Sequence, residues 1–302
     1  MPRRSRRAGE APKEEGTRWE LEEGEEIAPG RLALKRLGWG NLYETYLAWD
    51  DRLFSIVVAK LLRPDKVADD SALRSLTREA ESLERLAHPL LVRSFGSVLN
   101  GPKPHLLLEH LEGPSLHSLI RKHAPLPLEQ ILPLALDLCS ALHYLETEDM
   151  VHLDVKPRNV IMGPAPKLVD LSLARSVESA QRLSGGAGTE GYMAPEQIEP
   201  TAERRIGPAT DVWGLAVTVF EAISGRLPFA TPNPPLTAAD VTGGPEPLPD
   251  EVPATLAQLL AGCLSPDPVE RPRASQVAVE LRPLVEVIGT RRVIRRRRPG
   301  IR

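Results

Sequence analysis

The hydrophobic pattern of this chain changes period once, and that change restricts the fold more than any other feature of the sequence. Before about residue 110, short apolar runs separated by turn signals predict strands at 32–34, 43–49, 56–62, 92–98 and 105–109. A single helical pattern interrupts these strands at residues 69–86. Beyond about residue 112, helical spacing predicts helices at 128–145, 212–223, 256–263 and 277–287. We therefore expect an α+β chain, in which a small β-rich part with one main helix precedes a larger helical part.

The composition is that of a globular protein with one large domain or two medium ones. The chain has 302 residues, of which 41% are hydrophobic, and a formal net charge of −3. These values exclude a disordered chain and a strongly basic nucleic-acid binder. Cys139 and Cys263 form neither a disulfide framework nor a CxxC metal motif. The longest apolar stretch, residues 212–223, is too short to span a membrane and no signal-peptide core follows the N-terminus, so we expect a cytoplasmic protein.

Charge is concentrated at the two ends of the chain. Residues 1–30 hold six basic and eight acidic side chains, and residues 288–302 hold seven arginines and no acid. We expect a flexible extension over 1–30, a folded domain over 31–287 and an Arg-rich tail over 288–302. Two interpretations of the tail stay open: a weak contact with an anionic surface, or a solvated terminus, which we favour.

Four motifs follow one another in the helical part. They are His152-Leu153-Asp154-Val155-Lys156-Pro157-Arg158-Asn159, Asp170-Leu171-Ser172, Ala194-Pro195-Glu196 and Asp211-Val212-Trp213-Gly214. In this order, and after a β-rich part, they resemble the Ser/Thr protein kinases of the bacterial, eukaryotic-like kind. The resemblance covers about residues 31–287. It implies the two-lobed protein kinase fold, with a small lobe over about 31–111 and a larger helical lobe over about 112–287.

The resemblance assigns a role to each polar residue around the first two motifs. Phosphoryl transfer needs cations around the phosphate and a correctly aimed hydroxyl group. By position, Asp154 is the catalytic base, and Lys156 neutralises the transferred γ-phosphoryl group. Asn159 and Asp170 supply oxygen ligands to Mg²⁺, or to Mn²⁺ in its place.

The nucleotide site is assigned in the same way. Lys60, at the end of a predicted strand, contacts the α- and β-phosphates of ATP and pairs with Glu79 on the first helix. The remaining nucleotide-binding positions are Gly38, Gly40, Thr45, Val58, Glu109, Leu111 and Ile161. Tyr43 stands where the third glycine of the Gly-rich loop is usual, a change that we expect to reduce nucleotide affinity.

Two departures from the family pattern concern regulation. Leu153 stands where many kinases carry the arginine that binds a phosphorylated activation loop, so we expect activity that does not depend strongly on phosphorylation at 173–193. Ser172 replaces the glycine after Asp170 and Leu171, and we expect it to restrict the conformations of that loop.

Further positions match structural features of the family. We expect Asp211 to brace the catalytic loop, Glu196 and Arg271 to form a buried ion pair, and Thr189 to reach Asp154 and Lys156. The Pro-rich stretch at 231–250 stands where members of the family usually have a docking helix, so we expect the docking of protein substrates to be altered.

Three functions are compatible with these residues. We favour a Mg-ATP-dependent kinase that phosphorylates Ser and Thr hydroxyls of proteins, itself included, because every charged catalytic position is filled. A pseudokinase acting as a nucleotide-binding or scaffold module is the alternative, and a small-molecule kinase or nucleotidyl transferase on a kinase-like fold is a third. The partners are then a protein substrate and ATP, without sequence-specific nucleic acid or a membrane span, and a homodimer stays open.

Overall fold

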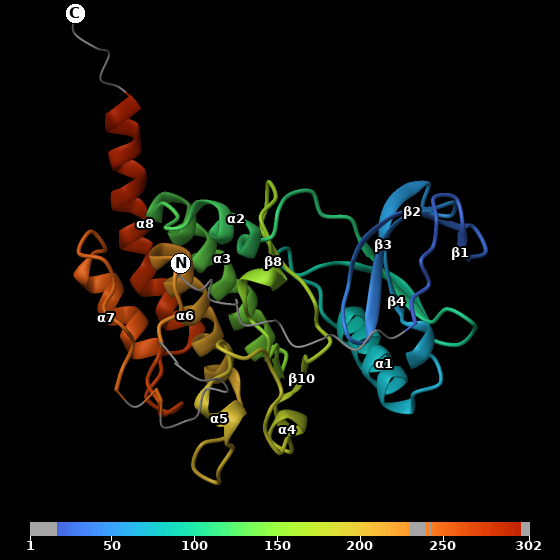
Figure 1. Cartoon of the computed structure of the whole chain (residues 1–302). Coiled ribbons are helices and arrows are strands. Elements are labelled where there is room, and N and C mark those ends of the chain that lie inside the picture. The colour runs from blue at the N-terminus through green and yellow to red at the C-terminus, as the bar shows by residue number, and fades with distance from the viewer. Residues whose placement is uncertain (1–16, 230–239, 242, 297–302) are drawn as a thin grey trace, which may run out of the picture. The chain divides into compact units, whose positions relative to one another are not determined.

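The computed structural model describes residues 17–229, 240–241 and 243–296, with side chains described as far as residue 287 (Figure 1). The chain divides into two compact units. Unit 1 comprises Met1–Thr77 and Phe95–His110, and unit 2 comprises Arg78–Ser94 and Leu111–Arg302. Apart from the segment 78–94, the β-rich unit precedes the helical unit in sequence, as the change of hydrophobic period predicts. Their secondary structure is that of the two lobes of the expected fold.

Unit 1 is built on a six-stranded sheet in the order β1-β2-β3-β4-β6-β5. Its strands are β1 (Glu26–Ala28), β2 (Arg31–Trp39), β3 (Tyr43–Asp50), β4 (Ser55–Leu62), β5 (Ser94–Val98) and β6 (His105–Glu109). A 3-10 turn, η1 (Pro64–Lys66), leads to α1 (Asp70–Arg85), which begins in unit 1 and ends in unit 2. The predicted strands are confirmed, although the strand predicted at 32–34 extends over all of β2, and the strand predicted at 92–98 begins two residues later, as β5.

The two faces of this sheet differ in burial. Side chains alternate between the faces of a strand, and along β3 and β4 one set of alternate positions is fully buried: Glu44, Tyr46, Ala48, Val57, Ala59 and Leu61. On the opposite face Tyr43, Thr45, Leu47 and Val58 are only half-buried. The main core of unit 1 therefore lies on one face of the sheet, and on the other face these half-buried side chains lie beside the buried Lys60 and Leu62.

The segment before β1 covers the buried face, which corrects the expectation of a flexible extension over 1–30. Trp19 and Leu21 pack against the core of the sheet, and the Trp19 indole Nε1–H donates to the Leu62 carbonyl oxygen at 2.7 Å. The Leu21 N–H donates to the Tyr46 hydroxyl at 3.2 Å. Apolar side chains among the acidic ones give this segment a buried side, so within the described part residues 17–30 belong to unit 1.

Unit 2 is mainly helical. Its helices are α2 (Leu116–His123), α3 (Leu128–Thr147), α4 (Val177–Ala180), α5 (Pro195–Ile198), α6 (Pro208–Ser224), α7 (Ala254–Cys263) and α8 (Ala274–Arg296). Two short antiparallel pairs lie among them: β7 (Met150–Val151) with β10 (Arg175–Ser176), and β8 (Val160–Ile161) with β9 (Lys167–Leu168). A 3-10 turn, η2 (Pro157–Asn159), precedes β8.

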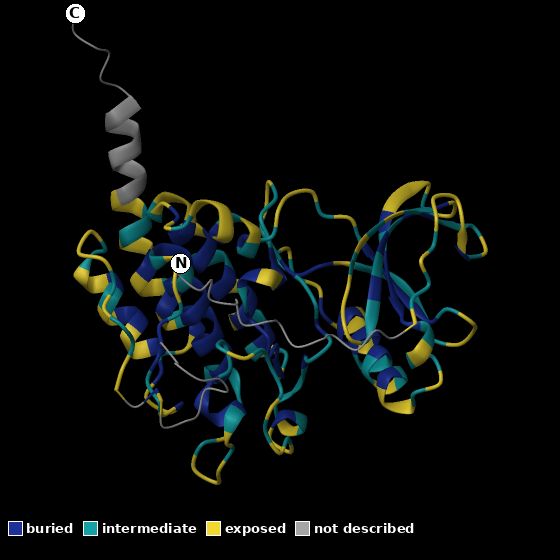
Figure 2. Cartoon of the chain, in the orientation of Figure 1, coloured by how far each residue is buried: buried dark blue, intermediate teal, exposed yellow. Residues whose placement is uncertain are grey.

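Helix α6 is the buried centre of unit 2. It is apolar on nearly all sides, and nearly all of its residues from Thr210 to Ile223 are buried (Figure 2). It begins at Pro208, where proline is pre-organised for a first turn, and Gly225 follows its last residue with a left-handed φ of 78°. Helix α3 packs against both α6 and α8 (Figure 1).

Helix α8 is longer than the pattern predicts. Its backbone continues from the expected end at residue 287 to Arg296, so it takes in part of the segment assigned to an Arg-rich tail. The rest of that tail, residues 297–302, lies outside the described residues, as do 230–239 and 242 within the Pro-rich stretch. Within the described ranges, no helix combines the length and apolar character needed to cross a membrane.

Candidate active site

The segment His152–Asn159 is held to α6 by a buried carboxylate. Asp211 Oδ2 accepts a hydrogen bond from the His152 N–H at 2.7 Å, and Oδ1 accepts one from the Leu153 N–H at 2.8 Å. Burial raises the pKa of Asp211, whereas His152 and the two backbone donors act in the opposite direction. The bracing role predicted for Asp211 is confirmed.

Gly214 allows the same loop to approach α6 closely. A Cβ atom at this position would lie 2.9 Å from the Val155 carbonyl oxygen, closer than real Cβ atoms come to such an atom. Leu153 adopts a left-handed φ of 67°, which is costly for a residue with a branched side chain. The loop therefore depends on contacts with α6 to keep its conformation.

Three polar side chains meet at Asp154, which is 8% exposed. The Thr189 hydroxyl donates to Asp154 Oδ1 at 2.6 Å, and Lys156 Nζ donates to Oδ2 at 2.6 Å. Lys156 Nζ also donates to the Thr189 hydroxyl oxygen. Asn159 Nδ2 donates to Asp154 Oδ2 at 3.0 Å and to its carbonyl oxygen at 2.9 Å. The predicted contacts of Thr189 are confirmed, and the carboxylate has a fixed orientation beside an ammonium group.

The pair assigned to Mg²⁺ fits that ion chemically. Because the amide nitrogen of Asn159 is committed to Asp154, its Oδ1 faces away from that bond. The Val169 N–H donates to the Asn159 carbonyl oxygen at 2.8 Å, which brings the segment ending at Asp170 next to Asn159. Oxygen donors suit Mg²⁺, which commonly takes one or two protein ligands and completes its shell with phosphates and water. In the described ranges no group of three or more His, Cys, Asp or Glu side chains could hold a metal ion.

In unit 1, the strand register gathers residues assigned to the nucleotide on one face. Thr45, Lys60 and Leu106 form one row across β3, β4 and β6, and Leu47, Val58 and Leu108 form the next. Directly opposed residues of antiparallel strands share a face, so Thr45, Val58 and Lys60 lie together on the half-buried face. Gly38 is the penultimate residue of β2, and the Gly40 N–H donates to the Tyr43 carbonyl oxygen at 2.8 Å across the turn to β3.

Other predicted site residues are divided between the units. Lys60 and Glu109 belong to unit 1, whereas Glu79, Leu111 and Ile161 belong to unit 2. Lys60 and Glu79 are both buried, at 8% and 1% exposure. Their pairing, and a common nucleotide site built from both units, stay predictions.

The position of Leu153 bears on the expected regulation. Its side chain lies in a buried apolar cluster with Val151, Ala180 and Ile206, against which Leu173, Val177 and Leu183 pack. The segment after Asp170 is thus attached to the catalytic loop by apolar contacts, at the position where many kinases carry an arginine.

Gln197 is a residue of this site that the sequence analysis missed. Its Nε2 donates to the Leu153 carbonyl oxygen at 2.9 Å and to the Ala187 carbonyl oxygen at 2.6 Å. It therefore joins the catalytic loop to the segment that carries Thr189. Its position directly after Glu196 is the only hint that the sequence contains.

The predicted ion pair of Glu196 and Arg271 is also confirmed. Both side chains are fully buried, with Arg271 Nη1 2.7 Å from Glu196 Oε1 and Nη2 2.9 Å from Oε2. The Thr210 hydroxyl donates to Oε1 at 2.8 Å, and the guanidinium lies 4.9 Å from the centre of the Trp213 ring. This arrangement ties α5 to α6 and to the segment before α8.

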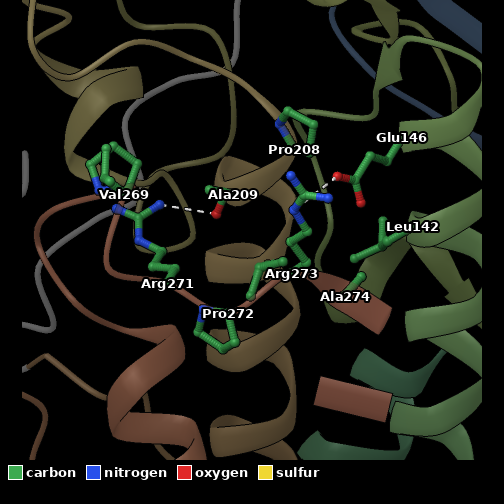
Figure 3. Close-up of a pocket in the computed structure, with 11 residues that line it drawn as sticks. Leu142, Glu146, Pro208, Ala209, Val269, Arg271, Pro272, Arg273 and Ala274 are labelled. Carbon is green, nitrogen blue, oxygen red and sulfur yellow. Dashed lines mark hydrogen bonds and ion pairs between the residues drawn. The ribbon is translucent and has the colours of Figure 1, made fainter. Parts of the chain in front are cut away.

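A pocket of about 270 Å³ lies beside this ion pair (Figure 3). It is lined by residues of α3, of α6 and of the segment 268–274, and Arg271 Nη1 donates to the Ala209 carbonyl oxygen at its wall. Arg273 Nε lies 3.8 Å from Glu146 Oε1 at its edge. None of the residues assigned to catalysis, nucleotide or metal lines this pocket, so we do not assign it to the active site.

Comparison with known proteins agrees with this geometry. Residues 32–280 match the family described as Protein kinase domain. The chain is 30% identical to the serine/threonine-protein kinase PknB of Mycobacterium leprae over 207 residues, which covers 66% of this chain and 33% of that protein. It is 30% identical to the probable serine/threonine-protein kinase PkwA of Thermomonospora curvata over 258 residues, 84% of this chain and 34% of that protein. The chain thus spans about a third of the length of these relatives.

Proposed function

The chain belongs to the protein kinase family, and we propose that it is a Mg-ATP-dependent Ser/Thr protein kinase. It transfers the γ-phosphoryl group of ATP to Ser or Thr hydroxyls of proteins, itself included. The observation that carries the proposal is the network in which Lys156, Thr189 and Asn159 orient the Asp154 carboxylate. The similarity to proteins named as serine/threonine kinases supports the same activity.

In this mechanism the chain mainly positions groups and neutralises charge. Bound Mg-ATP would supply the phosphoryl group, and Asn159 and Asp170 would hold its metal through oxygen atoms. Asp154 accepts the proton of the substrate hydroxyl as the new P–O bond forms and the bond to the β-phosphate oxygen breaks. Lys156, whose Nζ lies 2.6 Å from Asp154 Oδ2, neutralises charge on the transferred group. Lys60 is assigned to the α- and β-phosphates, and the resemblance assigns Glu79 as its partner.

The nucleotide base occupies the half-buried face of the unit 1 sheet. Thr45 and Val58 line it, and Gly38 and Gly40 bring the backbone close to the phosphates. The resemblance assigns Ile161 to the nucleotide as well. The Glu109 carbonyl and the Leu111 N–H bind the adenine edge.

The apolar cluster around Leu153 makes this activity independent of phosphorylation in the activation segment. A phosphate stabilises such a segment chiefly by pairing with arginine. Here Leu153, Ala180 and Val177 hold the segment through packing instead. We further propose that the enzyme acts in the cytoplasm, on protein substrates, with a kinase domain that includes residues 17–30.

The test is transfer of labelled phosphate from Mg-ATP to the protein itself and to a generic basic protein. We expect the wild type to transfer phosphate, and both Lys60→Met and Asp154→Ala to lose transfer while remaining folded. Asp154→Ala should keep its ATP affinity, since Asp154 is assigned to the substrate hydroxyl group and not to the nucleotide. ATP binding without any transfer by the wild type would contradict the proposal and favour a pseudokinase.

A further inference from the structure

We propose that Tyr43 is a positioning residue that holds the Lys60 ammonium group against its ring and thereby sets the affinity of the site for the phosphates of ATP. The inference rests on the proposed function, because it assumes that Lys60 contacts those phosphates. It differs from the expectation that Tyr43 merely replaces a glycine, since it gives the aromatic ring an electrostatic role.

The strand register places the two residues on the same side of the sheet. Tyr43 opposes Leu62 and Thr45 opposes Lys60 in the pairing of β3 with β4, so Tyr43 and Lys60 are diagonal neighbours on one face. Lys60 Nζ lies 4.5 Å from the centre of the Tyr43 ring. An ammonium within about 6 Å of a ring centre is attracted by the negative face of the ring. Lys60 is 8% exposed, so this attraction is little weakened by water.

The Gly-rich turn keeps the ring in this place. The Gly40 N–H donates to the Tyr43 carbonyl oxygen at 2.8 Å, and the Arg63 N–H donates to the Leu42 carbonyl oxygen at 2.9 Å. The Arg63 guanidinium donates to the Gly40 carbonyl oxygen at 3.2 Å and pairs with Asp65 at 3.1 Å. Because Arg63 directly follows β4 and is 7% exposed, a buried cation braces the tip of the turn from the strand that carries Lys60.

This geometry makes the ring and the phosphates competitors for one ammonium group. When phosphate binds Lys60, the contact with the ring is weakened, and that loss reduces the net affinity for ATP. A ligand without phosphates leaves the contact between Lys60 and the ring intact, so its affinity is not reduced. Removal of the ring should therefore tighten ATP and leave adenosine unchanged.

The experiment measures dissociation constants of Mg-ATP and of adenosine by calorimetry for the full chain. We expect Tyr43→Gly and Tyr43→Leu to tighten Mg-ATP about threefold to tenfold, the range of one cation–π contact, and to change adenosine by less than about twofold. Tyr43→Leu keeps bulk at the position and so separates the ring from simple obstruction. Tyr43→Phe keeps the ring and should behave as the wild type.

Phe54→Ala is the matched control, because Phe54 is an aromatic side chain of unit 1 that is 81% exposed and lies in the turn between β3 and β4. Phe54→Ala should alter neither the dissociation constant of Mg-ATP nor that of adenosine. Equal tightening of ATP and adenosine, or a Tyr43→Phe variant that behaves as Tyr43→Gly, would overturn the inference while the kinase assignment stands. A wild type that binds adenosine but shows no added affinity for ATP over adenosine, unchanged in Lys60→Met, would overturn the role of Lys60 and the inference with it.

Discussion

The two units hold their functional side chains in different ways. In unit 1, Thr45 and Lys60 share a face because β3 pairs with β4 in a regular antiparallel register. In unit 2, the loop that carries Asp154 has no such ladder. It is held by side chains from distant parts of the chain, such as Asp211, which bonds to Leu153 across 58 positions of sequence.

This difference determines what a substitution can disturb. Backbone pairing places a residue whatever its side chain, so a change in unit 1 should alter a single contact. A buried polar side chain in unit 2 fixes several backbone groups at once, and its loss leaves them unpaired. Changes in unit 2 should therefore affect stability and activity together, and changes in unit 1 should separate them.

The largest effect is expected from Glu196→Ala in unit 2. It leaves Arg271 buried without its partner, and we expect the free energy of unfolding to fall by about 3–5 kcal/mol. Phosphoryl transfer should fall with it, although Glu196 is assigned no contact with substrate. Denaturant unfolding and transfer assays check this, with the exposed Glu199→Ala as control. An unchanged free energy of unfolding would contradict the contrast drawn between the two units.

Trp19→Leu is the corresponding test in unit 1. The substitution removes the bond from Nε1 to the Leu62 carbonyl oxygen and part of the packing on the sheet, which should cost about 2–3 kcal/mol of stability. Since the register of β3 and β4 places the side chains that we assign to the nucleotide, the ATP affinity of the folded protein should stay within about twofold of the wild type. Calorimetry below the melting temperature measures it. Phe54→Leu, on an exposed aromatic residue, is the control, and a parallel loss of affinity would contradict the prediction.

Thr189→Val sharpens the description of the Asp154 network. The substitution keeps the shape of the side chain and removes the hydroxyl that bonds to both Asp154 and Lys156. We expect the transfer rate to fall about tenfold, as for the loss of one orienting hydrogen bond, with little change in ATP affinity. Thr189→Ser should restore most of the rate, and failure to do so would assign the effect to packing.

A smaller, pH-dependent effect is expected from His105 in unit 1. Burial lowers the pKa of His105 below 6.5, and the Arg31 guanidinium, 3.0 Å from its Nε2, lowers it further. Below the pKa that His105 has in the unfolded chain, the unfolded protein binds a proton at this imidazole and the folded protein does not. The free energy of unfolding therefore falls as the pH drops below about 6.5.

Melting temperatures from about pH 8 to about pH 5 test this prediction. The decline in melting temperature with falling pH should be shallower in His105→Gln than in the wild type. His123→Gln, which changes an exposed histidine, should follow the wild type. An identical decline in the His105 variant would show that other groups control it.

The smallest effect is expected from Ser184→Ala. Ser184 is exposed in the activation segment, and the apolar cluster around Leu153 needs no phosphate to hold that segment. The transfer rate should stay within about twofold of the wild type, because no arginine–phosphate pair is lost. A hundredfold loss would show that the segment depends on phosphorylation after all.

Much of the site could be predicted because its residues lie in short contiguous motifs. The positions of Asp154, Lys156 and Asn159 follow from one eight-residue segment, and the strands of unit 1 from apolar runs between turns. The ion pair of Glu196 with Arg271 followed from two more motifs. The roles of these residues in catalysis and binding stay predictions that the assays above test.

The rest depended on contacts between segments with no motif of their own. Trp19 stands in an acidic stretch, Arg63 between a strand and a proline, and Gln197 beside a motif, and none has a local pattern that announces its partner. Local periodicity and short motifs determined which residues form the elements and which carry the chemistry. Only the tertiary structure decided that Trp19 covers the sheet, that Arg63 braces the Gly-rich turn and that the Tyr43 ring faces Lys60, because such contacts join positions whose separation in sequence carries no information about their distance in space.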